Sequence, residues 1–215
     1  MGRIGNVWAP VGLLLIAALL AAGCGRVGQG GSRTRDIDEL VAILRDPLSP
    51  EFPAAVNQLA DMGPAASIAS VDLARALSYP RRDSYYAGVA LVRMGPSAGE
   101  AIPILVATLE NEREAVRRFA AASLGSIGAS ASCAVPALAD HLWDTEPWVR
   151  TASAGAIEAI SGRDLLPPTY ELRVTHPGSV AADEPEGSLT SAARDWWTST
   201  GRLLAWPPLS ECGSP

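Results

Sequence analysis

The sequence predicts an all-α fold, an α-solenoid of about four two-helix repeats closed by a C-terminal helix that contains two Trp residues. Three observations support this prediction. One segment recurs at intervals of 32 to 33 residues, its apolar residues fall at helical spacing, and Pro and Gly residues separate the copies. The composition, 48% apolar and 19% charged, is that of a chain that folds around a core.

The recurrent segment is clearest in the second half of the chain. Residues 116–128 read VRRFAAASLGSIG, and residues 149–161 read VRTASAGAIEAIS. Earlier copies keep the apolar positions and the glycine that follows them. The matching residues are Ala55, Leu59, Met62 and Gly63; Ala87, Leu91, Met94 and Gly95; and Ala120, Leu124, Ile127 and Gly128. Two-helix units of this length that stack on one another form an α-solenoid.

A second type of helix follows the recurrent segment. Residues 134–138, AVPAL, repeat residues 101–105, AIPIL. Because a proline in a helix interior costs about 3 kcal/mol, Pro103 and Pro136 predict that these helices start late or bend. Asp36 and Glu39 have the spacing of a capping box, which predicts the start of the array. The array is therefore assigned to residues 36–162.

The N-terminal segment predicts export. Residues 1–23 contain one Arg and the apolar run VGLLLIAALLAA, which is typical of a signal peptide. The end of this segment, Leu-Ala-Ala-Gly before Cys24, resembles a bacterial lipoprotein signal. The resemblance implies cleavage before Cys24 and lipidation of Cys24. The Gly-rich residues 24–35 then form a flexible tether. The alternatives are a free Cys24 after an ordinary cleaved signal, or an uncleaved N-terminal anchor.

The pattern VR-x-x-A-x-x-x-L-x-x-I-G, followed by AVPAL-x-x-x-L-x-D, resembles HEAT repeats of the short bacterial kind that phycobilisome lyases also contain. The resemblance covers residues 36–162. In that family an Asp and an Arg six residues apart bridge the turn between paired helices. Asp144 with Arg150 fits this spacing, and Asn111 with Arg117 is a near match.

The resemblance also implies a binding surface. In HEAT arrays the second helix of each unit lines the concave side, and here that helix is the one formed by the recurrent segment. Tyr and Arg on this helix are candidates because both are enriched at binding hot spots. An ordinary solvated helix face is the alternative. The candidate surface residues are Tyr85, Tyr86, Arg93, Arg117, Arg118, Thr151 and Glu158.

The C-terminal residues 163–215 predict an irregular connection followed by a cap. Residues 188–205 fit an amphipathic helix, broken or bent at Gly201, with Leu189, Ala192, Ala193, Trp196, Trp197 and Leu203 largely on one side. Such a helix would cover the apolar face that the last repeat leaves open. An exposed Trp platform that binds a sugar or peptide is the alternative.

No residue pattern points to catalysis, a metal or a cofactor. The two histidines, His141 and His176, have no second histidine at helical spacing, and His141 aligns with Thr108 at a position expected to face solvent. The net charge of −6 argues against a nucleic-acid partner. Cys133 and Cys212 either form a disulfide bond or stay separate, with Cys133 in a small half-buried helix position.

These observations predict a lipid-anchored protein that faces the extracytoplasmic side of a membrane. It is expected to be no enzyme, to bind no small-molecule substrate, and to act as a binding or scaffolding module for another protein of the cell envelope. Two alternatives remain open. One is a lyase-like enzyme related to the bilin-attaching HEAT proteins, and the other is a structural envelope assembly factor.

Overall fold

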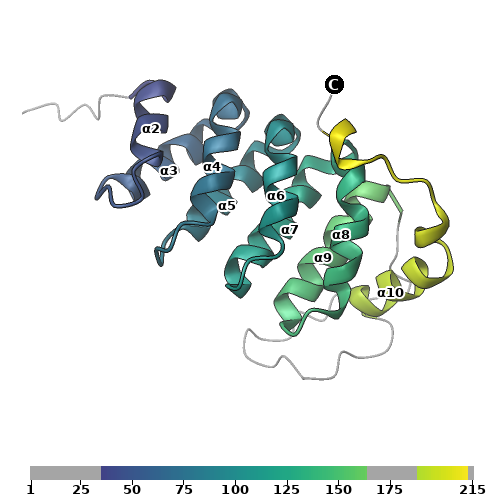
Figure 1. Cartoon of the computed structure of the whole chain (residues 1–215). Coiled ribbons are helices and arrows are strands. Elements are labelled where there is room, and N and C mark those ends of the chain that lie inside the picture. The colour runs from purple at the N-terminus through teal and green to yellow at the C-terminus, as the bar shows by residue number, and fades with distance from the viewer. Residues whose placement is uncertain (1–34, 164–187, 213–215) are drawn as a thin grey trace, which may run out of the picture. The chain divides into compact units, whose positions relative to one another are not determined.

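The computed structural model describes residues 35–163 and 188–212, and all of them except Arg35 belong to the compact unit that begins at Asp36. The predicted signal peptide, Cys24, nearly all of the tether and His176 lie outside the described residues. Across the described residues every element is an α-helix or a 3₁₀-helix, and none of them is a strand (Figure 1). The predicted all-α solenoid is confirmed.

Two kinds of α-helix alternate along the array and lie side by side in successive pairs (Figure 1). The first helices are α2 (Ile37–Leu44), α4 (Ser70–Leu77), α6 (Ile102–Thr108) and α8 (Val135–Asp140). The second helices are α3 (Phe52–Met62), α5 (Tyr85–Met94), α7 (Glu114–Ile127) and α9 (Pro147–Ser161). The 3₁₀-helices η1 (Gly63–Ala69), η2 (Gly95–Ala101) and η3 (Gly128–Ala134) link them, and η4 (His141–Trp143) follows α8.

Glycine and proline set the boundaries of these helices. α3, α5 and α7 each end at a glycine whose φ is positive and whose ψ is strongly negative, for example 56° and −132° at Gly95. A side chain at that position would be strained, so the recurrent glycine is required by the backbone. Pro103 and Pro136 are the second residues of α6 and α8, where a missing N–H costs nothing. These helices therefore start late, as predicted.

The core runs along the stack of second helices. Leu59, Leu91, Leu124 and Ile157 occupy the same repeat position on successive helices and are fully buried. Small residues let the helices approach closely. A Cβ atom added to Gly88 would meet Phe119, and one added to Gly125 would lie 2.9 Å from the Cα atom of Ala156. The Ala- and Gly-rich composition of these helices therefore has a packing cause.

Gly125→Ala is expected to destabilise the protein, because its methyl group would push α7 away from α9. Overpacking outweighs the gain in helix propensity and leaves a net loss of about 1–2 kcal/mol in the free energy of unfolding. Gly99→Ala is the matched control, since a Cβ atom there meets nothing within 4 Å. Urea unfolding measures both. Equal midpoints for the two variants would contradict the close contact.

Two stretches, Tyr85–Thr108 and Glu114–Trp143, are long and apolar enough to cross a membrane by length and composition alone. Each consists of a second helix, a 3₁₀-helix and the next first helix, and the second stretch also includes η4. Each also contains a residue with non-helical dihedral angles, Ala98 or Ala131. Their apolar residues belong to the core of the array, which accounts for their hydropathy.

The C-terminal segment covers the end of the array. α10 (Leu189–Ser199) packs on α9, where Ile157 and Ile160 are buried (Figure 1). Trp196 and Trp197 pack against this core as partly buried side chains. The prediction for Leu203 is wrong, because its side chain is 77% exposed. α10 ends at Ser199 and the chain forms η5 (Gly201–Leu203), so Leu203 does not continue the apolar side of α10.

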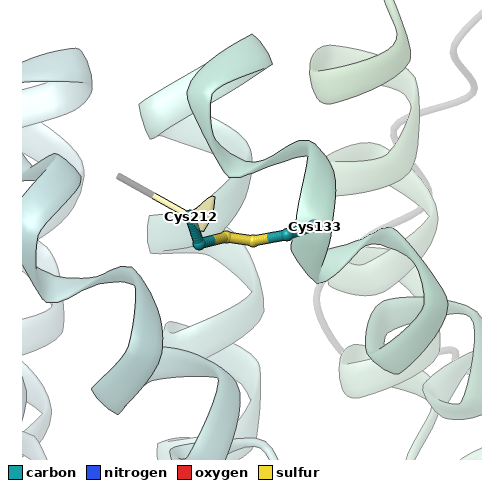
Figure 2. Close-up of a disulfide and its surroundings, with 2 residues drawn as sticks. All are labelled: Cys133 and Cys212. Atoms are coloured by element: carbon teal, nitrogen blue, oxygen red, sulfur yellow. A yellow bond between two sulfur atoms is a disulfide. The ribbon is translucent and has the colours of Figure 1, made fainter. Parts of the chain in front are cut away.

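The last described residues return to the array. Cys212, which follows η6 (Leu209–Glu211), forms a disulfide bond with Cys133 of η3 (Figure 2). Their Cα atoms lie 5.8 Å apart, a normal separation for a disulfide. The bond joins residues 79 positions apart in the sequence. It therefore decides the alternative that the sequence left open, and it ties the cap to the third connection of the array.

Thiol labelling tests this bond directly. We expect an alkylating reagent to leave Cys133 and Cys212 unmodified in unfolded, unreduced protein, and to modify both after reduction. Peptide mass spectrometry should recover the two cysteines in one linked peptide. Alkylation of either residue before reduction would contradict the bond.

Candidate functional site

Two successive second helices share an aromatic cluster. The ring of Tyr85 stacks on Tyr86 at 4.4 Å and on Phe119 at 5.7 Å between centroids. The guanidinium of Arg118 lies 4.8 Å from the centre of the Phe119 ring. Tyr86 is 39% exposed and the other members are half-buried. We call Tyr85, Tyr86, Arg118 and Phe119 the aromatic cluster; it joins α5 to α7.

The Tyr85 hydroxyl of the cluster is a neutral hydrogen-bonding group. A side-chain hydrogen bond with Tyr86, followed by partial burial, raises the pKa of the Tyr85 hydroxyl. Tyr85 therefore stays protonated at neutral pH. The cluster presents apolar ring faces, phenol hydroxyls and one guanidinium, which are groups suited to contact with a protein surface.

Phe119 was missing from the residues predicted from the sequence. It lies 33 positions after Tyr86 and so occupies the same place in the next repeat. That alignment was a usable signal. An aromatic residue at this position in two successive repeats puts two rings on neighbouring helices.

The remaining predicted residues are spread over the same helices. Arg93 is exposed and pairs with Asp61 of α3, with its Nη1 atom 3.1 Å from Asp61 Oδ1. Both side chains are largely solvated, so this pair adds little to stability. Thr151 and Glu158 both lie on α9. Thr151 is exposed and occupies the repeat position of Arg118, and Glu158 is half-buried.

Arg117 differs from the other predicted surface residues. Its Nε and Nη2 atoms each donate to the carboxylate of Asp144 at 2.8 Å, and its side chain is 13% exposed. Its Nη1 atom donates to the backbone carbonyl groups of Asn111 and Glu112. The guanidinium thus holds a turn of the array together.

The expected bridge between Asp144 and Arg150 takes another form. The carboxylate of Asp144 faces α7 and accepts from Arg117 of the preceding repeat. Arg150 donates to the backbone carbonyl groups of Asp144 and Thr145. The spacing of six residues is used, but through the carbonyl group of Asp144, because Arg117 already occupies the carboxylate.

Asp144 is the most strongly perturbed acid in the described residues. Burial alone would raise its pKa, but hydrogen bonds from Arg117, the backbone N–H of Glu146 and His141 outweigh burial and lower the pKa to about 2. The carboxylate is therefore ionised throughout the physiological range.

His141 is not solvent-facing, contrary to the prediction. Its side chain is 11% exposed and lies between two carboxylates, with Nδ1 3.3 Å from Asp144 Oδ2 and Nε2 3.5 Å from Glu110 Oε1. The aligned residue, Thr108, is buried as well. The described residues contain no group of three His, Cys, Asp or Glu side chains that would hold a metal ion.

Arginines also connect successive turns. Arg81 donates to the carbonyl groups of Pro47 and Ser49 in the preceding turn. Arg113, 32 residues later, donates to the carbonyl groups of the next turn, and Arg194 of α10 donates to that of Leu142. Backbone carbonyl groups of each turn thereby accept hydrogen bonds from the unit that follows.

Comparison with known proteins locates one family. Residues 74–159 match HEAT repeats. No curated protein and no solved structure matches the chain. The matched residues include α5, α7 and nearly all of α9, and therefore the whole aromatic cluster. The match and the stacked helix pairs together support a HEAT-repeat protein.

Proposed function

We propose that this chain is an exported, lipid-anchored protein that binds another protein of the cell envelope and has no catalytic role. HEAT repeats generally serve as protein-binding or scaffolding modules, which supports a binding role. The observation that carries the proposal is the aromatic cluster, because it brings stacked rings and a guanidinium together on α5 and α7, with Tyr86 exposed.

The cluster is suited to binding because its rings are already ordered. Tyr85 stacks on two neighbours, so a partner that packs on Tyr86 immobilises few side chains. Tyr and Arg are among the residues that contribute most at interfaces. The disulfide between Cys133 and Cys212 supports export, since such bonds persist in oxidising compartments.

Photocrosslinking tests the binding surface. Thr151 occupies the position of Arg118 in the next repeat and is exposed. A photoreactive amino acid at Thr151 should therefore crosslink to a defined envelope protein in intact cells. The same group at Ile68, which is 67% exposed on η1, is the control. We expect Tyr86→Ala to abolish the crosslink at Thr151 while leaving the fold intact. A crosslink that is insensitive to Tyr86→Ala would contradict the proposed surface.

Fractionation tests the anchor. Cys24→Ser should move the protein from the detergent phase to the aqueous phase, because the acyl chains would be missing. Mass spectrometry of the wild-type N-terminus should find a modified Cys24. An unmodified Cys24, or an intact Met1, would contradict lipidation.

A further inference from the structure

The last described residues form a tail on the surface of the array. From Pro208 to Glu211 every side chain is exposed, and Leu209 is 49% exposed. The regular structure of this segment is η6, a single 3₁₀ turn, and such turns are weakly stable on their own. The backbone N–H groups of Glu211 and Cys212 donate to carbonyl groups of the tail itself. The tail therefore has little order of its own.

Two contacts fix this tail. The ring of Trp206 meets Trp196 edge-on, and its Nε1 atom donates to the carbonyl group of Gly201 at 2.9 Å. Six residues later, Cys212 is bonded to Cys133 of η3 (Figure 2). Among the described residues, no hydrogen bond or ion pair joins residues 207–212 to the repeat array. We call residues 207–212 the strap, because the cap holds one end and the disulfide holds the other.

The cap does not depend on the strap. α10 has its own N-cap, Ser188, and packs on α9 with Ala193 fully buried. Arg194 donates to the carbonyl group of Leu142. Loss of the disulfide would therefore leave α10 in place. The strap would detach, because a chain end stays ordered only where it is tied down and these exposed residues make too few contacts to offset the entropy they regain.

The two sulfur atoms differ in their access to solvent. Cys133 is 5% exposed and belongs to the core, whereas Cys212 is half-buried and lies at the end of the exposed tail. Thiol–disulfide exchange begins when a thiolate attacks one sulfur of the bond, and access decides which sulfur is attacked. The attack is therefore expected at Sγ of Cys212, with Cys133 as the leaving group.

We propose that the bond between Cys133 and Cys212 is a redox-controlled clasp, which a dithiol oxidoreductase opens to release the strap while the cap stays on α9. One thiolate of the reductant attacks Cys212, the bond to Cys133 breaks, and Cys133 takes up a proton. The second thiol of the reductant then displaces Cys212, which is also protonated. The dithiol becomes a disulfide, and the two cysteines gain two electrons and two protons. This device goes beyond the proposed binding role and is independent of the aromatic cluster.

Reduction of the folded full-length chain tests access to the clasp. Dithiothreitol should reduce the bond without denaturant. Glutathione, followed by an acid quench and peptide mass spectrometry, should be found on Cys212. A bond that resists dithiothreitol until urea unfolds the protein, or glutathione attached to Cys133 instead, would overturn the proposal.

Hydrogen exchange tests release of the strap. The amides of Glu211 and Cys212 are hydrogen-bonded in the oxidised protein. They should exchange at least about tenfold faster after reduction by dithiothreitol, and equally fast in unreduced Cys212→Ser, while peptides from α9 and α10 keep their rates. Unchanged rates in the strap would show that other contacts hold it. Faster exchange throughout α9 and α10 would show that the bond holds the whole cap. Either result overturns the clasp.

Cys212→Ser treated with dithiothreitol is the matched control, because it keeps every other cysteine of the chain. We expect the reductant to cause no further change in its exchange. A rise in strap exchange in this variant would show that the reductant acts at another site, and the assignment of the clasp to Cys133 and Cys212 would be wrong.

Discussion

Asp144→Ala is expected to lower the free energy of unfolding by about 3–5 kcal/mol, because it leaves the guanidinium of Arg117 largely buried without its carboxylate. The change also removes the acceptor for the backbone N–H of Glu146. Urea unfolding, followed by circular dichroism, measures the loss. Asp61→Ala is the matched control, since the pair between Asp61 and Arg93 is exposed and worth at most about 1 kcal/mol.

The same carboxylate predicts a loss of stability in acid. Its pKa in the folded protein is about 2, below its ordinary value of 3.8. The contribution of Asp144 is therefore fully present above about pH 4 and is lost as the pH falls toward 2, by roughly 2 kcal/mol. Stability measured against pH should show this fall in the wild type and a smaller one in Asp144→Asn. Equal falls in the two proteins would contradict the role of Asp144.

Replacing Trp196 and Trp197 together with Ala is expected to cost about 3–5 kcal/mol and to promote self-association. The two rings pack on the core beside α9, and Trp196 also meets Trp206 edge-on at 6.2 Å. Their removal would expose Ile157 and Ile160 at the end of the stack. Thermal unfolding measures the cost, and sedimentation velocity measures the association.

Two further variants separate packing from recognition. Trp148→Ala removes an exposed Trp and should leave the melting temperature nearly unchanged. Trp196→Phe should be tolerated, because the buried Nε1 atom of Trp196 has no acceptor among the described residues. If the double Ala variant stays monomeric, melts like the wild type and loses a partner, the Trp pair is a recognition site and the cap assignment is wrong.

The sequence was sufficient for features that repeat locally. The line of Leu59, Leu91 and Leu124 and the glycines that end each second helix recur at a constant interval, and so were visible without a structure. The cap was predictable because the last repeat needs one. The break at Gly201 was predictable too, but the direction of the chain after it was not, since a single glycine does not define that direction.

The side-chain network was harder to predict because it crosses repeats. The spacing of six between Asp144 and Arg150 is visible within one repeat, whereas Arg117 reaches Asp144 over 27 residues. The exposure of Trp148 was equally hidden, since its repeat position holds Ala115 in the previous unit. The disulfide depends on where the C-terminal tail runs, and that path carries no local pattern.

The arginine contacts between turns give the array a direction of assembly. Arg81 donates to carbonyl groups of the turn before it, Arg113 donates to those of the next turn, and Arg194 donates to one in the last turn. A chain that emerges N-terminus first from a ribosome or a translocation channel therefore presents each turn before the residue that satisfies it. Each unit therefore depends on its successor. In a nascent chain that stalls near Gly162, the carbonyl groups of Asp144 and Thr145 already accept from Arg150, but the carbonyl group of Leu142 still lacks its donor, Arg194.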